Sequence, residues 1–166
     1  MNAASETSAS TSVLFVCLGN ICRSPMAEGI FRHLVEARGL GHRFRIDSAG
    51  TGAWHVGEPP DPRAAATAER RGVALDSRAR QVVPEDLEAF DVVIAMDREN
   101  LRILRRMADG KGTGDARLHL MRSFDPEGDG EDVPDPYYGG PGGFEDVYEM
   151  ILRSCETLLD QLTEDS

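Results

Sequence analysis

The chain has 166 residues and a formal net charge of −11, which suits one domain with an adequate core and argues against nucleic acid as a partner. No apolar stretch is long enough to span a membrane. Three cysteines are too few for a cysteine-rich zinc cluster, and none of the four histidines stands at a paired ligand spacing, so we expect no metal and no other cofactor.

The start of the chain differs in composition from the rest. Residues 1–12 are rich in Ser, Thr and Ala and lack both a basic start and an apolar core. They are predicted to form a disordered tail and not a signal peptide, which leaves 13–166 as the folded domain. The apolar run Val13–Val16 follows, and it is typical of a strand buried on both faces of a parallel sheet.

The segment after this strand has the residues of a tight loop that leads into a helix. Gly19 and Asn20 tolerate the positive φ that such a turn demands. Ser24 is expected to cap the helix and Pro25 to occupy its first position, with the helix running to about Arg38. The helix is therefore predicted to begin where the loop ends.

Strands and helices alternate along the rest of the chain. The predicted elements are a strand over 44–48, a helix capped by Asp61 and Pro62 that runs to Arg71 and is closed by Gly72, a strand over 91–95, a helix capped by Asp97 that runs to Met107, and a strand over 117–120. The last helix has an apolar face from Phe144 to Leu162, Cys155 included, that is expected in the core. This order predicts an α/β fold in one domain, with a doubly wound, four-stranded parallel sheet and helices on both faces. Ligands of such sheets bind beyond the carboxyl ends of the strands, where Cys17 falls.

The loop between Cys17 and Ser24 is predicted to bind an oxyanion. Its backbone N–H groups can converge on one point at the positive end of the helix. Arg23 can fold over the same point and offer its planar fork to two oxygens of a phosphate. In that field we expect Cys17 to be a thiolate and a nucleophile, with Ser24 donating its hydroxyl to the sulfur. The N–H groups concerned belong to Leu18, Gly19, Asn20, Ile21, Cys22 and Arg23.

Hydrolysis of a phosphate ester also needs an acid for the leaving oxygen, and the loop contains none. Asp135 lies between Pro134 and Pro136, which keep the backbone extended so that its carboxyl can project toward a cleft. The residues alone also allow a solvated loop carboxylate, because acidic side chains crowd just upstream. The residues alone also allow Cys17 and Cys22 to be core thiols or to form a disulfide.

Four stretches of the chain together resemble one known family. They are Cys17–Pro25, Asp47–Thr51 with Trp54 just after it, Ala95–Asp97 with Asn100, and Asp135–Tyr138. In order and spacing they resemble the low-molecular-weight protein tyrosine phosphatases, and the resemblance covers Val13 to about Leu162. It implies hydrolysis of phosphotyrosine on proteins, and of small aryl phosphates, through a cysteinyl-phosphate intermediate without a metal. It also implies that Asp135 acts first as general acid and then as general base.

The resemblance assigns further roles around the loop. Trp54, Tyr137 and Tyr138 resemble the aromatic walls of a substrate pocket that is deep enough to favour phosphotyrosine, and tyrosines at the last two positions are phosphorylated in some members. Cys22 resembles a second loop cysteine that can form a reversible disulfide with Cys17 and protect it from irreversible oxidation. A small residue turned inward is an equal reading of Cys22.

Asn20 and Ser48 resemble a hydrogen-bonded pair that supports the loop, with Ser24 in the same network. Many members of the family add a histidine to this network, and the present chain has Ser77 at the aligned position. This departure puts the details of the supporting network in question but not the chemistry of the loop.

Three alternative functions share parts of this pattern. A thiol-dependent arsenate reductase of the same fold needs further cysteines downstream, and none lies between Cys22 and Cys155. A protein arginine phosphatase of this fold usually has Thr where this chain has the apolar Ile21, which favours tyrosine. A non-catalytic phosphate-binding module would be expected to lose the thiol or the acid, and both are present.

The resemblance also bears on partners and compartment. It implies phosphotyrosine-containing protein substrates, and we expect a monomer or a weak dimer with no nucleic-acid or membrane partner. Cysteine is sparse and the proposed chemistry needs a free thiol, so a reducing cytoplasm is the expected compartment. Secretion without a signal peptide is left open.

Overall fold

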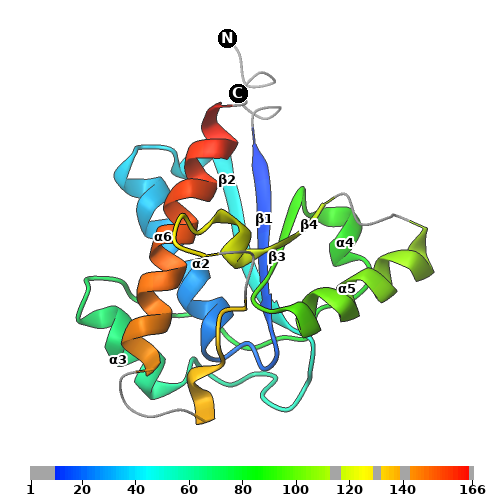
Figure 1. The fold of residues 1–166 in the computed structure, drawn as a ribbon, viewed down its shortest axis with the longest axis horizontal. Coiled ribbons are helices and arrows are strands. Elements are labelled where there is room, and N and C mark those ends of the chain that lie inside the picture. The colour runs from blue at the N-terminus through cyan, green and yellow to red at the C-terminus, as the bar shows by residue number, and fades with distance from the viewer. Residues whose placement is uncertain (1–9, 113–116, 129–131, 139–142, 165–166) are drawn as a thin grey trace.

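The computed structural model describes residues 10–112, 117–128, 132–138 and 143–164. Its centre is a sheet of four parallel strands in the order β2–β1–β3–β4 (Figure 1). The strands are β1 Thr11–Cys17, β2 Phe44–Gly50, β3 Val92–Ala95 and β4 Leu118–Leu120. Each of the four strands begins and ends within two residues of the range predicted from the sequence. The doubly wound, four-stranded parallel sheet is thus confirmed.

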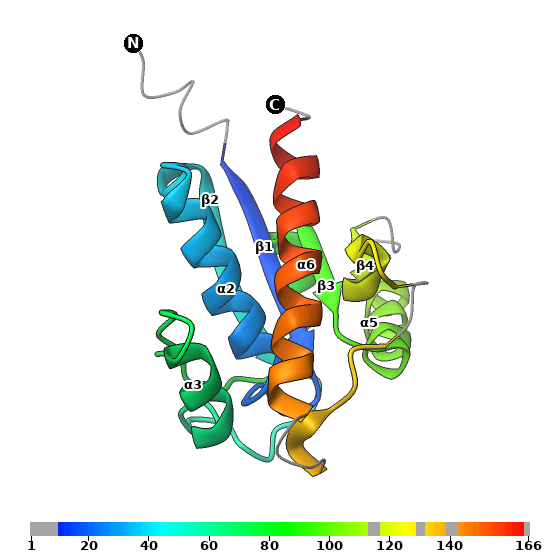
Figure 2. The ribbon, with the colours of Figure 1, turned by 60° about the vertical axis from the view of Figure 1, so that its left-hand side comes forward.

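Helices cover both faces of the sheet. The helices are α2 Arg23–Ala37, α3 Pro62–Glu69, α4 Asp86–Ala89, α5 Arg98–Lys111 and α6 Gly143–Glu164, with short 3-10 turns at η1 Gly41–Arg43, η2 Met121–Phe124 and η3 Pro136–Tyr138. Helices α2, α3 and α6 lie on one face, and α4 and α5 lie on the other (Figure 1, Figure 2). In the described ranges we find no helix with the length and apolar character that crossing a membrane requires.

The central strand β1 is buried on both faces. Val13, Phe15 and Cys17 belong to the core formed with α2, α3 and α6, whereas Leu14 and Val16 belong to the core formed with α4 and α5. Full burial of an aliphatic or aromatic side chain contributes about 1.5–3 kcal/mol to folding. The strand is therefore firmly held, and its carboxyl end places Cys17 beside the end of β2.

The predicted helix caps are right in two cases and wrong in one. Asp61 and Asp97 each accept a hydrogen bond of 2.8 Å from a backbone N–H in the first turn of the helix that follows, as expected. Ser24 does not cap α2, because that helix already begins at Arg23. The Ser24 hydroxyl lies 3.0 Å from the Cys17 sulfur instead.

Element ends differ from the predictions by a few residues. Helix α2 starts two residues before the predicted Pro25, α3 ends at Glu69, and α5 continues past Met107 to a left-handed Gly112 with a φ of 73°. The expected N-terminal tail falls for the most part on residues 1–9, which lie outside the described residues, and β1 begins within the rest of it.

A buried ion-pair cluster anchors the segment after β4 to α6. The Asp125 side chain is fully buried and pairs with Arg122 at 3.2 Å and with Arg153 of α6 at 3.0 Å. Burial opposes ionisation of this carboxyl, but the hydrogen bonds and the charge of Arg153 outweigh it and hold the pKa of Asp125 below its usual value. The cluster therefore stabilises the fold only while Asp125 is ionised.

The variant Asp125→Asn is expected to lower the free energy of unfolding by about 3 kcal/mol at neutral pH, because two guanidinium groups lose a buried carboxylate. Since the folded pKa of Asp125 is depressed, this contribution is present above the unfolded pKa of about 3.9 and is lost as the pH falls through the folded value. Urea unfolding at about pH 7 and about pH 3 measures the difference, which should shrink at the lower pH. An equal loss at both pH values would contradict the assignment.

The matched control is Asp160→Asn, which removes an exposed ion pair with Arg38 at 2.9 Å. Exposed pairs contribute little, so this change should cost less than about 1 kcal/mol at either pH.

Candidate active site

The loop that follows β1 is held against the end of β2. The N–H groups of Thr51 and Gly52 donate to the carbonyl oxygens of Cys17 and Leu18, each at 2.9 Å. A Cβ at Gly50 would lie 2.8 Å from the Leu18 oxygen, so this close approach of the two backbones requires glycine. The loop therefore has one side fixed to the sheet.

Asn20 organises the loop around the Cys17 sulfur. It has the positive φ, 57°, that the sequence predicts for this turn, whereas Gly19 does not. Its backbone N–H donates to Cys17 Sγ at 3.3 Å, and its side-chain amide donates to Ser24 Oγ at 2.8 Å and to Ser48 Oγ at 3.0 Å. Ser24 Oγ lies 3.0 Å from the sulfur. Two donors thus face Cys17 Sγ, and the Asn20–Ser48 hydrogen bond implied by the resemblance is present.

The network continues from Ser48 to a buried carboxylate. The Ser48 hydroxyl donates to Glu28 Oε1 at 2.5 Å, and Arg32 pairs with Glu28 Oε2 at 3.0 Å. Because Ser48 gives its only proton to Glu28, its oxygen accepts from Asn20. The second Asn20 proton then goes to Ser24, whose own hydroxyl proton can go to the Cys17 sulfur at 3.0 Å or to the more distant Ala49 carbonyl at 3.5 Å.

Arg23 is buried, with 2% of its surface exposed, and is fixed by groups outside the loop. Its Nη1 donates to Asp97 at 2.7 Å and to the Val133 carbonyl at 2.9 Å, and its Nη2 lies 3.5 Å from Asp135. Burial opposes the charge, but the negative charges of Cys17, Asp97 and Asp135 outweigh it and raise the pKa of Arg23. With Nη1 held in this way, the Nε–Nη2 edge is the one that can face two oxygens of an anion.

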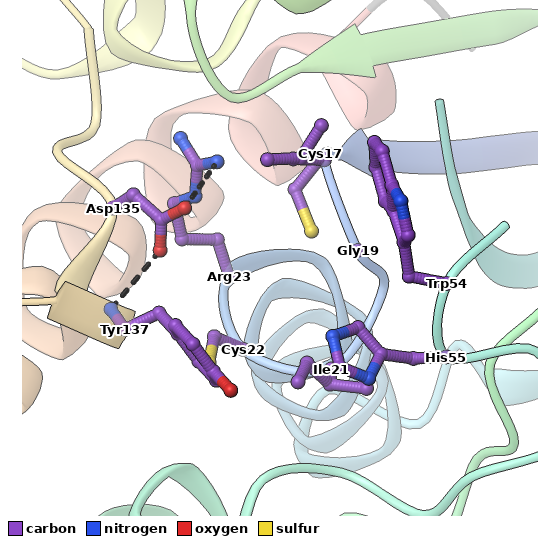
Figure 3. A pocket seen from close by; sticks show the side chains of 10 residues that line it. Cys17, Gly19, Ile21, Cys22, Arg23, Trp54, His55, Asp135 and Tyr137 are labelled. Carbon is purple, nitrogen blue, oxygen red and sulfur yellow. Dashed lines mark hydrogen bonds and ion pairs between the residues drawn. The ribbon is translucent and has the colours of Figure 1, made fainter. Parts of the chain in front are cut away.

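Asp135 faces the loop from the segment just before η3. Its Oδ2 makes the ion pair with Arg23, and its Oδ1 accepts a hydrogen bond of 3.0 Å from the Tyr137 N–H. Figure 3 shows its carboxyl group and the Cys17 sulfur turned toward the same open space. The side chain of Asp135 is 29% exposed, so it can exchange protons with solvent.

These groups border a cavity of about 440 Å³. Its lining residues are Cys17, Leu18, Gly19, Ile21, Cys22, Arg23, Trp54, His55, Asp135 and Tyr137 (Figure 3). Trp54 and Tyr137, two of the aromatic walls expected from the sequence, both line it; Trp54 is 72% exposed and forms the outer rim. The side chain of Tyr138, the third expected wall, lies outside the described residues.

Cys22 lines the same cavity as Cys17. Burial first, and then the negative charges of Asp61 and Cys17, raise the pKa of the Cys22 thiol, which therefore stays protonated. The cysteines Cys17, Cys22 and Cys155 are free thiols in the structure. A reversible disulfide between Cys17 and Cys22 stays a prediction.

Two side chains of the site are missing from the sequence-based prediction. His55 rests on Gly19, where an added Cβ would approach its ring to 3.1 Å, and its Nδ1 lies 3.0 Å from Glu58. Its ring centroid lies 6.2 Å from that of Tyr137. The sequence predicts Asp97 as a helix cap and as part of the resemblance, without a contact to Arg23, yet its second oxygen pairs with the loop arginine. Adjacency to Trp54 is the available signal for His55, and the Ala95–Asp97 stretch of the resemblance is the one for Asp97.

Comparisons with known proteins agree with this geometry. The family model described as low molecular weight phosphotyrosine protein phosphatase matches residues 12–166. A Streptomyces coelicolor protein named low molecular weight protein-tyrosine-phosphatase is 49% identical over 154 residues, which cover 92% of this chain and 93% of that protein.

Solved structures give the same result. The crystal structure of YfkJ from Bacillus subtilis has a TM-score of 0.88 at 46% identity and covers 95% of this chain and 97% of its own. That of a Drosophila arginine phosphatase has a TM-score of 0.86 at 38% identity, with 93% and 99% covered. The chain therefore belongs to the low molecular weight phosphotyrosine protein phosphatase family, whose members are hydrolases of phosphate monoesters.

Proposed function

We propose that this protein hydrolyses phosphotyrosine on protein substrates, and that Cys17 is the nucleophile. The observation that carries the proposal is the meeting of the Cys17 sulfur, the Arg23 guanidinium and the Asp135 carboxyl around one cavity at the start of α2. A nucleophile, a fixed cation and a proton donor are what a metal-free phosphatase needs.

The phosphate group binds between the loop and Arg23. In the described chain, the N–H groups of Ile21, Cys22 and Arg23 have no intramolecular hydrogen-bond acceptor, as is typical of a helix N-terminus. They can donate to the phosphate oxygens, while the Nε–Nη2 edge of Arg23 binds two oxygens as a fork. This arrangement neutralises the phosphate dianion and places phosphorus above the Cys17 sulfur.

In the first step, the Cys17 thiolate attacks phosphorus in line with the leaving phenolic oxygen. A phosphorus–sulfur bond forms as the phosphorus–oxygen bond breaks, and Asp135 gives its proton to the phenolic oxygen. The loop N–H groups and Arg23 stabilise the negative charge on the equatorial oxygens of the transition state. The product is a cysteinyl phosphate and a free tyrosine hydroxyl.

In the second step, water attacks the cysteinyl phosphate. Asp135, now a carboxylate, takes a proton from that water as the new phosphorus–oxygen bond forms and the phosphorus–sulfur bond breaks. The Ser24 hydroxyl, 3.0 Å from the sulfur, supports Cys17 as the leaving thiolate. Inorganic phosphate leaves, and both groups return to their starting protonation states.

The shape of the cavity supports an aryl phosphate as substrate. Trp54 and Tyr137 flank it, and the apolar Ile21 also lines it, so a flat ring can enter between apolar surfaces. Phosphoserine would be too short to bring its phosphate to the sulfur at the base. The second candidate is protein phosphoarginine, because a Drosophila arginine phosphatase has the same fold at a TM-score of 0.86.

A comparison of substrates separates these two candidates. We expect kcat/KM for a phosphotyrosine peptide to exceed that for a phosphoarginine peptide of the same sequence by about 100-fold or more, because the apolar Ile21 lines the pocket. A reversed preference would make phosphoarginine the substrate in place of phosphotyrosine, and thioredoxin-coupled reduction of arsenate would point to an arsenate reductase. The free thiols of Cys17 and Cys22 suit a reducing compartment, and we propose the cytoplasm.

The role of Asp135 predicts a dependence on the leaving group. Asp135→Asn is expected to lower kcat/KM for phenyl phosphate by about 1,000-fold but for p-nitrophenyl phosphate by about tenfold, since nitrophenolate leaves without a proton. The quantity kcat/KM reports steps up to release of the phenol, so it isolates the acid role. The matched control is Asp132→Asn, a nearby exposed carboxylate paired with Arg98, which should change neither value. Equal slowing of both substrates would remove Asp135 from the role of acid.

A further inference from the structure

Arg63, in the first turn of α3, lies between the phosphate loop and the segment that carries Asp135. Its guanidinium binds both oxygens of Asp61, with distances of 3.1 Å and 2.9 Å. Its Cζ also lies 5.3 Å from the ring centroid of Tyr137 and 4.9 Å from that of Phe144, within the range of cation–π contacts. One side chain thus contacts the helix cap Asp61, the ring of Tyr137 in η3 and the ring of Phe144 at the start of α6.

The anchor of Arg63 is tied to the phosphate loop. The backbone N–H of Asp61 donates to the Ile21 carbonyl at 2.8 Å, and Asp61 is buried with 7% exposure. Its carboxylate caps α3, and the hydrogen bond from Arg63 is the main cause that holds the pKa of Asp61 below its usual value. The position of the guanidinium is therefore set relative to the loop that binds phosphate.

The other end of the connection reaches the proposed acid. Tyr137 donates its backbone N–H to Asp135 Oδ1 at 3.0 Å, so movement of Tyr137 moves the donor that orients this carboxyl. The ring of Tyr137 contacts Arg63 and also His55, whose ring centroid is 6.2 Å away. Of these two contacts of the Tyr137 ring, the one with Arg63 is charged. The planar guanidinium of Arg63 can pair with the Asp61 carboxylate and stack on the Tyr137 ring at the same time.

We propose that Arg63 is a positioning residue for the general acid: by holding Tyr137 against α3, it keeps the Asp135 carboxyl directed at the leaving oxygen. This inference rests on the proposed function and adds a residue that touches neither the phosphate nor the reacting atoms. Through Asp61 and Tyr137, Arg63 couples the geometry of the phosphate loop to that of the acid.

The test compares three variants on two aryl phosphates. Arg63→Met keeps an unbranched apolar stem but removes the charge, and it is expected to lower kcat/KM for phenyl phosphate about fivefold to tenfold and for p-nitrophenyl phosphate less than about twofold. Arg63→Lys keeps a cation near the ring and should recover phenyl phosphate hydrolysis to within about threefold of the parent. The matched control Arg70→Met removes an exposed pair with Glu145 of α6, also beside α3, and should change neither substrate.

A double-variant cycle shows whether Arg63 acts through Asp135. In the Asp135→Asn protein, Arg63→Met should have an effect of less than about twofold on phenyl phosphate, because the group that it positions has lost its proton. Full additivity would overturn the inference, as would equal losses on both substrates or no loss at all. If Asp135→Asn has the expected leaving-group dependence and Arg63→Met does not, only this inference fails. If Asp135→Asn itself lacks that dependence, the proposed acid and this inference fail together.

Discussion

Cys17→Ser is expected to abolish turnover while the protein still binds oxyanions. Serine has the same shape, but its hydroxyl is not ionised at neutral pH, so the attacking group is lost and the rate should fall by at least about 10,000-fold. The phosphate site survives, because it is made of the α2 N-terminus and Arg23, which the substitution leaves in place. The Cys17→Ser variant thus separates phosphate binding, which should persist, from the chemical step, which should be lost.

Trp54 provides the binding measurement for this variant. It is the single tryptophan of the chain and lines the cavity, so its fluorescence should respond when phosphate or vanadate enters. A phosphate Kd within about threefold of the parent value is expected for Cys17→Ser. The matched control is Cys155→Ala, a change of a buried core thiol that should leave turnover intact. Residual turnover above the expected limit in Cys17→Ser would remove Cys17 as nucleophile.

The local part of the site could be predicted from the sequence. The strand, the loop and the helix from Val13 to Ala37 follow one another without a break, and their residue types determine a geometry that short-range physics controls. The same holds for the caps Asp61 and Asp97, which act within three residues of their own position. Ser24 fails as a cap because α2 already begins at Arg23, whereas the contact predicted between its hydroxyl and the Cys17 sulfur is present at 3.0 Å.

The contacts that hold Arg23 and Ser48 from other segments could not be predicted, because they join residues far apart in the chain, and only the Asn20–Ser48 hydrogen bond was implied by the resemblance. Val133 and Asp97 reach Arg23 only after β3 has taken its place beside β1, and the sequence pattern gives no distance between such segments. The same applies to Glu28, whose spacing to Arg32 marks an ordinary helical ion pair and not a group that accepts from Ser48.

Two groups that were not predicted from the sequence support the loop network. They are the Arg80 backbone N–H, which donates to Asn20 Oδ1 at 3.0 Å, and the buried carboxylate of Glu28, which accepts from Ser48. The Arg80 side chain is itself held by Asp47 and Asp86, each at 3.1 Å. The loop is therefore supported by the segments that carry Glu28 and Arg80.

Arg23→Ala is expected to lose both turnover and oxyanion binding, which distinguishes it from Cys17→Ser. Removal of the guanidinium takes away the two-point contact with the phosphate and leaves Asp97 and Asp135 facing the site without their cation. Repulsion between the Asp97 carboxylate and the phosphate dianion adds to the loss. We expect kcat/KM to fall by about 1,000-fold or more and the phosphate Kd to rise by about 100-fold or more.

Arg23→Lys tests whether charge alone suffices. Lysine restores a cation, but one ammonium group cannot hold Asp97 and the Val133 carbonyl and still present a fork to two oxygens, so turnover should stay at least about 100-fold below the parent. The matched control is Arg98→Ala, an exposed arginine paired with Asp132, which should leave kcat/KM and the phosphate Kd unchanged. Phosphate titrations followed by Trp54 fluorescence, with melting temperatures to show that each variant is folded, complete the measurement. If Arg23→Ala binds phosphate as tightly as the parent, the anion is held by the loop N–H groups alone and the guanidinium is not part of the binding site.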